Sequence, residues 1–226
     1  MKLLKQALIF LLKKIEEFIF PKCCIMCGKL GKNTWCKECK HFLLTQAIYI
    51  VENKIKKGFY FNKHIYIFLY QGKIRNLILD YKFNDKSYLH EIFVKIIIKN
   101  KKICGILEKY DIIIPVPIHK KRKSDRGYNQ SELIASKICN YVKNIQYENK
   151  MIIKAKNTMP QSLLTKEQRK QNTQNVYKLI NKEKIENKKI ILFDDVYTTG
   201  STVNEISKLL KENGAKEIIV LTIAKD

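Results

Sequence analysis

Two adjacent acids and a run of hydroxyl side chains lie close together near the carboxyl end of the chain. Asp194 and Asp195 follow an apolar run at residues 189–193, and a hydroxyl-rich turn at residues 198–202 comes next. Ionised carboxylates accept strong hydrogen bonds from sugar hydroxyls and can also hold Mg²⁺, directly or through its water. A helix that starts at the turn offers unpaired N–H groups and a positive dipole end, which suit a phosphate dianion. The combination predicts a site for a ribose 5-phosphate group.

Each residue of this segment has a predicted role in that site. The two acids are assigned to the ribose hydroxyls, and the phosphate is assigned to Thr198, Thr199, Gly200, Ser201 and Thr202. Glycine at the third of these positions lets the backbone approach the ligand closely. A single helix cap would explain one of these residues but not their combination. A Walker-type nucleotide loop fits less well because no Gly-Lys-Ser/Thr is present.

A strongly basic segment follows another apolar run in the middle of the chain. Pro115 and Pro117 mark the end of that run, and five basic side chains then occur within seven positions, namely Lys120, Lys121, Arg122, Lys123 and Arg126. A pyrophosphate group needs positive charge both to bind and to leave. We therefore predict a pyrophosphate-binding loop that uses Lys120, Lys121, Arg122 and Arg126. A solvated basic turn and a nucleic-acid-binding patch remain alternatives.

Five of the seven cysteines are concentrated between Cys23 and Cys39. Cys24, Cys27, Cys36 and Cys39 form two pairs with two residues inside each pair and eight between them. Two such pairs on turns can bind zinc through four thiolates, and a closed shell of sulfur ligands indicates a structural role. Cys23 could replace Cys24 as a ligand, and His41 is a further alternative. The odd total and the clustering do not fit a secreted disulfide framework.

Alternating strands and helices must position these groups. Apolar runs predict strands at residues 64–70, 111–116, 145–153, 189–193 and 217–223. Helices are predicted at residues 72–83, 87–103, 129–142, 165–175 and 201–212, with Asn213-Gly214 as a stop signal after the last. This alternation predicts an α/β fold with a mostly parallel sheet flanked by helices. We expect two parts, an amphipathic helix with the cysteine segment at residues 1–50 and the α/β domain at residues 51–226.

The charge balance points to anionic partners. The chain has 44 Lys and Arg against 21 Asp and Glu, a formal charge of +23, which favours nucleic acid, phosphorylated ligands or an anionic membrane face. A general drift towards lysine is the alternative. Residues 1–20 predict a basic amphipathic helix that packs on the protein's own core or rests on a membrane surface, and the segment is too short and too charged to cross a bilayer. Without a cleavage site after it, a cytoplasmic location is expected.

Two resemblances agree with these predictions. Residues 189–202 resemble the motif of type I phosphoribosyltransferases that binds phosphoribosyl pyrophosphate (PRPP): an apolar strand, paired acids and Thr-Thr-Gly-Ser-Thr. Residues 115–130, with their prolines, basic run and Arg-Gly-Tyr-Asn-Gln, resemble the ComF (competence protein F) family. Further matches to that family are Pro160, Gln161, Leu164, Arg169 and Asn172. Lys154 or Lys156 stands where the family has arginine, which keeps the charge but loses bidentate geometry.

The ComF resemblance implies a type I phosphoribosyltransferase-like domain with an N-terminal zinc finger, and PRPP and Mg²⁺ as ligands. It also implies a role in natural transformation, in which the protein assists the uptake or handling of single-stranded DNA. Competence and recombination proteins, and the inner face of the cytoplasmic membrane, would then be partners. A metabolic phosphoribosyltransferase acting on a nucleobase or amine, with Asp194 and Asp195 as its catalytic acids, is one alternative. A non-catalytic scaffold is another, because a fold alone does not fix an acceptor.

Overall fold

The computed structural model describes residues 12, 21, 23–31, 35–53, 57–156 and 176–226. The chain divides into two compact units, Met1–Gln46 and Ala47–Asp226, and each is considered by itself. In the first unit, the described residues form a bridge between Cys23 and Leu30 and the helix α2 (Lys37–Gln46). The predicted helix at residues 1–20 lies, except for Leu12, outside the described residues. Within the described part of the chain, no helix has the length and apolar content needed to cross a lipid bilayer.

The second unit is built on a six-stranded sheet in the order β1-β2-β8-β7-β3-β4. Five of its strands run parallel, and β1 joins the edge antiparallel to β2. The strands are β1 (Ile50–Glu52), β2 (Lys63–Leu69), β3 (Ile112–Pro115), β4 (Gln146–Tyr147), β7 (Lys189–Tyr197) and β8 (Glu217–Lys225). The central strands are rich in isoleucine and buried along most of their length, as is typical of a parallel sheet covered on both faces.

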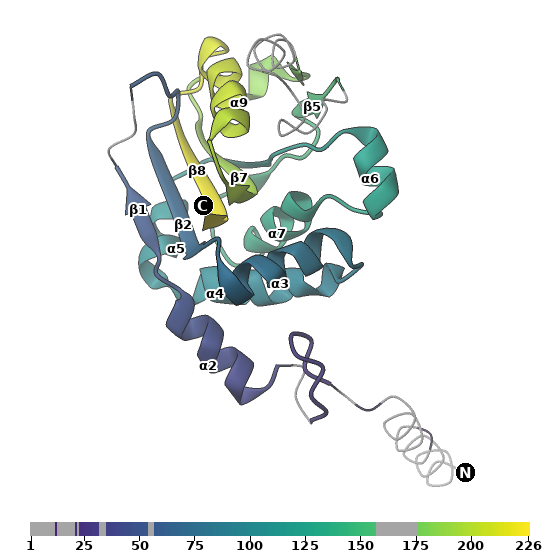
Figure 1. The fold of residues 1–226 in the computed structure, drawn as a ribbon. Helices are drawn as coiled ribbons and strands as arrows, with labels where there is room; N and C mark the ends of the chain where they lie inside the picture. Colours follow the sequence, from purple (N-terminus) through teal and green to yellow (C-terminus); the bar gives the residue numbers. More distant parts are fainter. Residues whose placement is uncertain (1–11, 13–20, 22, 32–34, 54–56, 157–175) are drawn as a thin grey trace, which may run out of the picture. The chain divides into compact units, whose positions relative to one another are not determined.

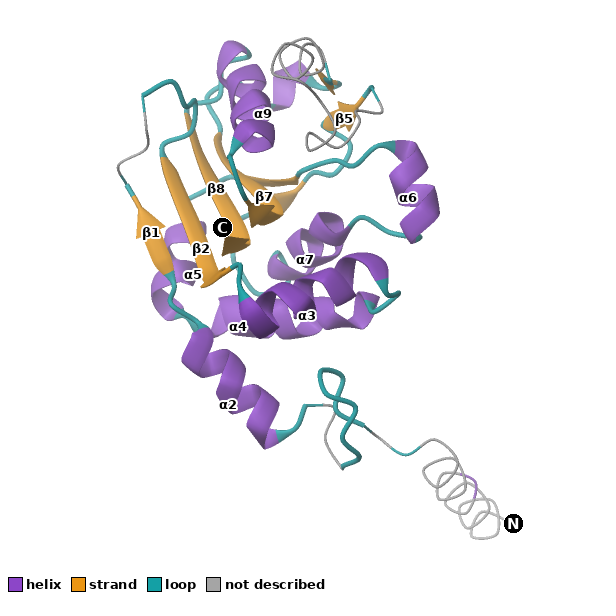
Figure 2. Ribbon diagram, in the orientation of Figure 1, coloured by secondary structure: helices purple, strands orange, loops and turns teal. Residues whose placement is uncertain are grey.

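Helices cover both faces of this sheet (Figures 1 and 2). One side carries α3, α4 and α7, and the other carries α9 and a small hairpin of β5 and β6. The bounds are α3 (Gly72–Phe83), α4 (His90–Lys99), α5 (Lys101–Leu107), α6 (Lys120–Arg126), α7 (Gln130–Ile138), α9 (Ser201–Glu212), β5 (Ile152–Lys154) and β6 (Tyr177–Leu179). Short 3-10 turns occupy Ser87–Leu89 and Lys182–Lys184. The predicted mixed α/β architecture is confirmed.

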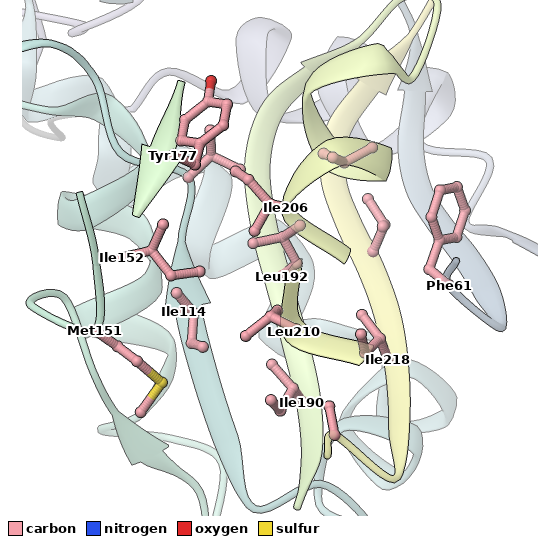
Figure 3. Close-up of a cluster of buried hydrophobic side chains, with 14 of the residues drawn as sticks. Phe61, Ile114, Met151, Ile152, Tyr177, Ile190, Leu192, Ile206, Leu210 and Ile218 are labelled. Carbon is pink, nitrogen blue, oxygen red and sulfur yellow. The ribbon is translucent and has the colours of Figure 1, made fainter. Parts of the chain in front are cut away.

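The core beneath α9 is a single apolar cluster (Figure 3). Ile206 and Leu210 of α9 pack onto Ile190 and Leu192 of β7. Ile152 and Tyr177 bring the β5–β6 hairpin into the same cluster. The hairpin is therefore attached to the domain by burial of apolar side chains, which is the main driving force of folding. The predicted helix at residues 165–175, and the matches between Pro160 and Asn172, lie outside the described residues.

Several element predictions need correction. The predicted helix at residues 87–103 is two helices, because Asn100 ends α4 and its side chain caps α5 by accepting from the Ile103 N–H at 3.0 Å. The predicted strand at residues 145–153 is two short strands in different sheets. The basic loop contains the helix α6, capped by His119 and ended by Gly127 at φ 74°. β7 continues to Tyr197, so both acids lie within the strand rather than after it.

Candidate functional site

The turn between β7 and α9 exposes polar groups at the start of a long helix. Gly200 is the N-cap of α9, and no side chain caps this helix. The Thr199 and Ser201 hydroxyl oxygens are 2.8 Å apart, and the Ser201 N–H lies 3.4 Å from the Thr199 hydroxyl oxygen. Thr198 is exposed and Thr202 half-buried. The Thr199 hydroxyl is a distant acceptor for the Ser201 N–H, and Gly200 at the N-cap has no side chain to offer the other first-turn N–H groups, at a place where hydroxyl donors gather.

Asp194 is placed by contacts with its neighbour and with the start of α7. Its Oδ1 atom accepts from the Asp195 N–H at 2.9 Å and from the Ser131 hydroxyl at 3.4 Å. Burial, followed by the charge of Asp195, raises the pKa of the Asp194 carboxyl to about 7, although the nearby Lys82 charge opposes the shift. A carboxyl with such a pKa exchanges its proton near neutral pH, which is common at ligand-binding sites.

Asp195 makes an ion pair that the sequence analysis did not predict. Its Oδ1 atom lies 2.8 Å from Nζ of Lys82, in the last turn of α3, and the two side chains are only 12% and 18% exposed. Burial alone would lower the pKa of the Lys82 ammonium, but the charge and hydrogen bond of Asp195 outweigh it and raise the pKa above its usual value. Lys82 is therefore held as a cation beside the acid pair.

The β5–β6 hairpin adds two more groups to this end of the sheet. The Tyr177 phenol interacts with the Thr202 side chain. Burial, followed by the negative charge of Asp194, raises the pKa of this phenol. Lys154 lies over the Tyr177 ring, 5.7 Å from its centroid, and is close enough to Arg122 and Asp194 to sense both charges. Tyr177 thus connects the hydroxyl turn with the acid pair, and Lys154 brings a cation from the hairpin.

The basic residues of α6 lie on two different faces of the helix. Arg122 and Arg126 are half-buried and four positions apart, which puts them on one face. Arg126 lies 4.6 Å from the centroid of the Phe83 ring and is close enough to Asp195 to sense its charge. Lys120 and Lys121 are exposed. The arginines therefore share a region with the acids, and the lysines point elsewhere.

The predicted residues thus fall into two groups. Both acids, the hydroxyl turn and the two arginines belong to one end of the sheet. Lys120 and Lys121 do not share the contacts of the arginines. The groups that the sequence analysis missed or left unassigned are Lys82, Ser131, Lys154 and Tyr177. Ser131 directly follows the Arg-Gly-Tyr-Asn-Gln motif, which was the one available signal, whereas nothing in the spacing of Lys82 links it to β7.

The cysteine segment brings four sulfur atoms together. The Sγ atoms of Cys24, Cys27, Cys36 and Cys39 lie within 4.8 Å of one another. Two backbone groups point at the sulfurs, since the Cys36 and Cys39 N–H groups donate to Cys24 Sγ and Cys36 Sγ at 3.4 Å. Gly28, at φ 75°, closes a turn in which its N–H donates to the Cys24 carbonyl at 2.8 Å. This four-sulfur cluster fits a tetrahedral zinc ion.

The two alternative zinc ligands lie outside this cluster. Cys23 is exposed and belongs to the bridge with Leu30, and His41 is exposed on α2. Among the described residues, the four cysteines are the only group of three or more His, Cys, Asp or Glu side chains at metal-binding distances.

Comparisons with known proteins agree with this architecture. Residues 132–226 match the model of the phosphoribosyl transferase domain. Competence protein F of Haemophilus influenzae is 31% identical over 207 residues, which cover 89% of this chain and 90% of that protein. Competence protein ComFC of Streptococcus pneumoniae is 25% identical over 92% of this chain and 83% of that protein. DNA utilization protein YhgH of Escherichia coli K12 is 28% identical over 69% of each chain.

Among solved structures, a purine phosphoribosyltransferase from Pyrococcus horikoshii is similar, with a TM-score of 0.41 and 16% identity, over 62% of this chain and 85% of that chain. The identity to competence protein F extends over both the cysteine segment and the α/β domain. With its parallel sheet, its phosphoribosyl transferase domain match and its four-cysteine cluster, the chain belongs to the competence protein F family.

Proposed function

We propose that the carboxyl end of the sheet binds PRPP. The hydroxyl turn and the N-terminus of α9 hold the 5-phosphate. Asp194 and Asp195 accept hydrogen bonds from the ribose hydroxyls. Arg122 and Arg126, with Lys154, neutralise the pyrophosphate group. Each ligand part thus meets the groups suited to it, since phosphates need donors and cations while sugar hydroxyls need acceptors.

A single observation carries this proposal. The start of α9 has no capping side chain, and Tyr177 joins Thr202 of its first turn to the charge of Asp194. The N-terminus of α9 therefore suits a phosphate on one side of Tyr177, and the acid pair suits hydroxyl donors on the other. A sugar phosphate supplies both groups in one molecule.

Calorimetric titration with PRPP tests the proposal, with ribose 5-phosphate and pyrophosphate as separate probes. PRPP should bind more tightly than either part, because it engages both groups of residues at once. Replacement of Asp194 and Asp195 by asparagine should weaken binding of PRPP and ribose 5-phosphate but leave pyrophosphate binding nearly unchanged. Equal loss for all three probes would show that the acids do not contact the sugar.

In a transfer reaction, the bond between the anomeric carbon and pyrophosphate would break, and pyrophosphate would leave with the electron pair. A nitrogen of a nucleobase or amine would form the new bond and lose a proton. The described residues near the acids include no group that we assign as the base for that proton. Incubation with PRPP and a panel of acceptors, with and without single-stranded DNA, separates the alternatives: pyrophosphate release indicates an enzyme, and PRPP binding without release indicates a binding module.

We propose that the four-cysteine cluster binds one structural zinc ion. All four positions of a tetrahedral ion would be filled by thiolates, so no position remains for a substrate. The site requires reduced cysteines, which supports a location in a reducing compartment.

We also propose that the chain handles single-stranded DNA in natural transformation. The printed names of its relatives, competence protein and DNA utilization protein, support this role. The formal charge of +23 supplies the nonspecific attraction to a polyanion. Binding to a fluorescent oligonucleotide should be measurable at low salt, and the logarithm of the affinity should fall linearly with the logarithm of salt concentration. No binding at low salt would favour a metabolic role.

A further inference from the structure

Lys82 occupies a fixed position beside the acid pair. Its carbonyl accepts from the Gln130 side chain at 3.3 Å, and the hydroxyl of the preceding Tyr81 donates to the Gln130 carbonyl at 2.8 Å. The Tyr128 hydroxyl in turn donates to the Tyr81 carbonyl at 2.5 Å. The end of α3 is therefore held against residues 128–130. This anchoring places the ammonium of Lys82 at 2.8 Å from Asp195 Oδ1.

The acid pair has few oxygens left for a divalent cation. Lys82 occupies one oxygen of Asp195, and Oδ1 of Asp194 already accepts from the Asp195 N–H and from Ser131. The described residues bring no third acidic, histidine or cysteine ligand to this pair at metal-binding distance. Mg²⁺ requires near-ideal octahedral oxygen geometry and gives up its water reluctantly. The pair with its bound ammonium does not fit a Mg²⁺ site.

We propose that Lys82 is a resident cation that takes the place of a divalent metal at Asp195 and keeps the acid pair free of metal. The ammonium orients the Asp195 carboxylate, so that its other oxygen can accept a hydrogen bond from a ribose hydroxyl. Any Mg²⁺ that accompanies PRPP would then be bound by pyrophosphate oxygens rather than by these acids. The ribose part of this inference rests on the proposed function, whereas the exclusion of metal does not.

The physical reason is repulsion at short range in a site with little water. An ammonium a few ångströms from Asp195 opposes the approach of a second cation, and the weak screening in a buried site makes this repulsion strong. Removal of the ammonium would take away the one cation that is ion-paired with Asp195 and leave Arg126 and Lys154 as the described cations whose charges reach the acids, so a divalent ion should approach the pair more easily. Lys82 is thus a positioning residue whose loss should create metal affinity.

Binding of Mn²⁺ alone to the zinc-loaded, full-length protein tests this prediction, with free Mn²⁺ measured by electron paramagnetic resonance. Lys82→Met and Lys82→Gln should each bind Mn²⁺ about tenfold more tightly than the wild type, or better. Lys82→Arg, which keeps the charge, should match the wild type. The gain should disappear in Lys82→Met combined with Asp195→Asn, because the released carboxylate is then absent.

Lys86→Met is a matched control, since Lys86 forms an equally short ion pair of 2.8 Å with Asp80, an acid that is not a member of the pair. This control should change Mn²⁺ affinity by no more than about twofold, because it frees a single half-buried carboxylate rather than a member of a pair. Unchanged Mn²⁺ affinity in both folded Lys82 variants would overturn the proposal.

A comparison of Asp195→Asn with the wild type provides a second test, which does not depend on whether the Lys82 variants fold. If Lys82 excludes metal, Asp195→Asn should leave the weak Mn²⁺ affinity of the wild type within about twofold. A tenfold loss would mean that the pair binds metal despite Lys82, and the proposal would be wrong. A Lys82 variant that gains Mn²⁺ affinity in a protein that does not bind PRPP would refute the proposed function but not the exclusion of metal.

Discussion

The ring of Tyr197 lies directly against the backbone of Gly200, so that a Cβ atom at Gly200 would collide with the Tyr197 hydroxyl and ring. The same ring stacks on His64, with 4.2 Å between centroids and an interplanar angle of 28°. His64 is buried, which lowers its pKa to about 4, and its Nε2 atom is 3.0 Å from the Thr222 hydroxyl. Tyr197 thus connects the hydroxyl turn to strands β2 and β8 and fixes the position of the turn relative to these strands.

Gly200→Ala should therefore displace the turn and abolish PRPP binding. The substitution adds a collision with Tyr197 to the strain of a φ of +76°. The strain alone costs about 1 kcal/mol in the free energy of unfolding. The collision adds to that cost and moves the N–H groups that should hold the phosphate. Thermal unfolding with and without PRPP measures both effects.

Gly214→Ala is the matched control for this substitution. Gly214 has a similar φ of +88°, but a Cβ there would make ordinary contacts of at least 3.5 Å with Glu186. It should lose only about 1 kcal/mol and keep its full response to PRPP. If Gly200→Ala kept that response too, the turn would not be the phosphate site.

Asp194→Asn should stabilise the protein without ligand at alkaline pH while weakening PRPP binding. Burial and the charge of Asp195 raise the pKa of the Asp194 carboxyl from 3.8 to about 7. The folded chain therefore binds this proton more tightly than the unfolded chain, and stability falls as pH rises from about 4 to about 7. Asparagine removes that loss and still offers an oxygen to Ser131 and the Asp195 N–H.

Unfolding by urea at pH 4.5 and pH 8 measures this effect. The variant should gain a few kcal/mol, roughly 3, over the wild type at pH 8 and much less at pH 4.5. A variant that was less stable than the wild type at pH 8 would contradict this prediction, because the Asp194 carboxylate would then raise the free energy of unfolding.

Sequence patterns predicted the parts of this site that are local in the chain. The strand, turn and helix at residues 189–212 and the four-cysteine cluster all follow from spacing and residue type. α6 was missed because its seven residues are all polar or charged and give no amphipathic pattern. That helix depends instead on its ends, where His119 caps the start and Gly127 takes a left-handed conformation.

The missed partners of the acids are distant in sequence. Lys82 reaches Asp195 only because α3 packs beneath the sheet with its last turn at the end of β7. Tyr177 and Lys154 reach the site because the hairpin is buried against α9. Neither contact could be predicted from a repeating pattern in the sequence, since tertiary packing alone brings these residues together.

The arginines of α6 should contribute more to PRPP binding than its lysines. Arg122 and Arg126 lie on the half-buried face near Lys154 and the acids, whereas Lys120 and Lys121 are exposed. Arg122→Gln with Arg126→Gln should weaken PRPP binding at least about tenfold, because a hydrogen bond to a charged group contributes about 1.5–3 kcal/mol. Lys120→Gln with Lys121→Gln removes the same charge and should change the affinity by less than about threefold. Equal losses in titration calorimetry would place the pyrophosphate along the outer face of α6.

Replacement of single cysteines should separate zinc ligands from the spare thiol. Cys27→Ser or Cys36→Ser removes one of four sulfurs that lie within 4.8 Å of one another, and about one zinc per chain should be lost on purification. Cys23→Ser is the control, since Cys23 is exposed and outside the cluster, and this variant should keep its zinc.

Because metal affinity contributes directly to folding, the ligand variants should also expose the segment at residues 23–46 to proteolysis. Elemental analysis and limited proteolysis measure the two outcomes. Zinc loss in Cys23→Ser, with retention in Cys27→Ser, would mean that Cys23 displaces a sulfur of the cluster.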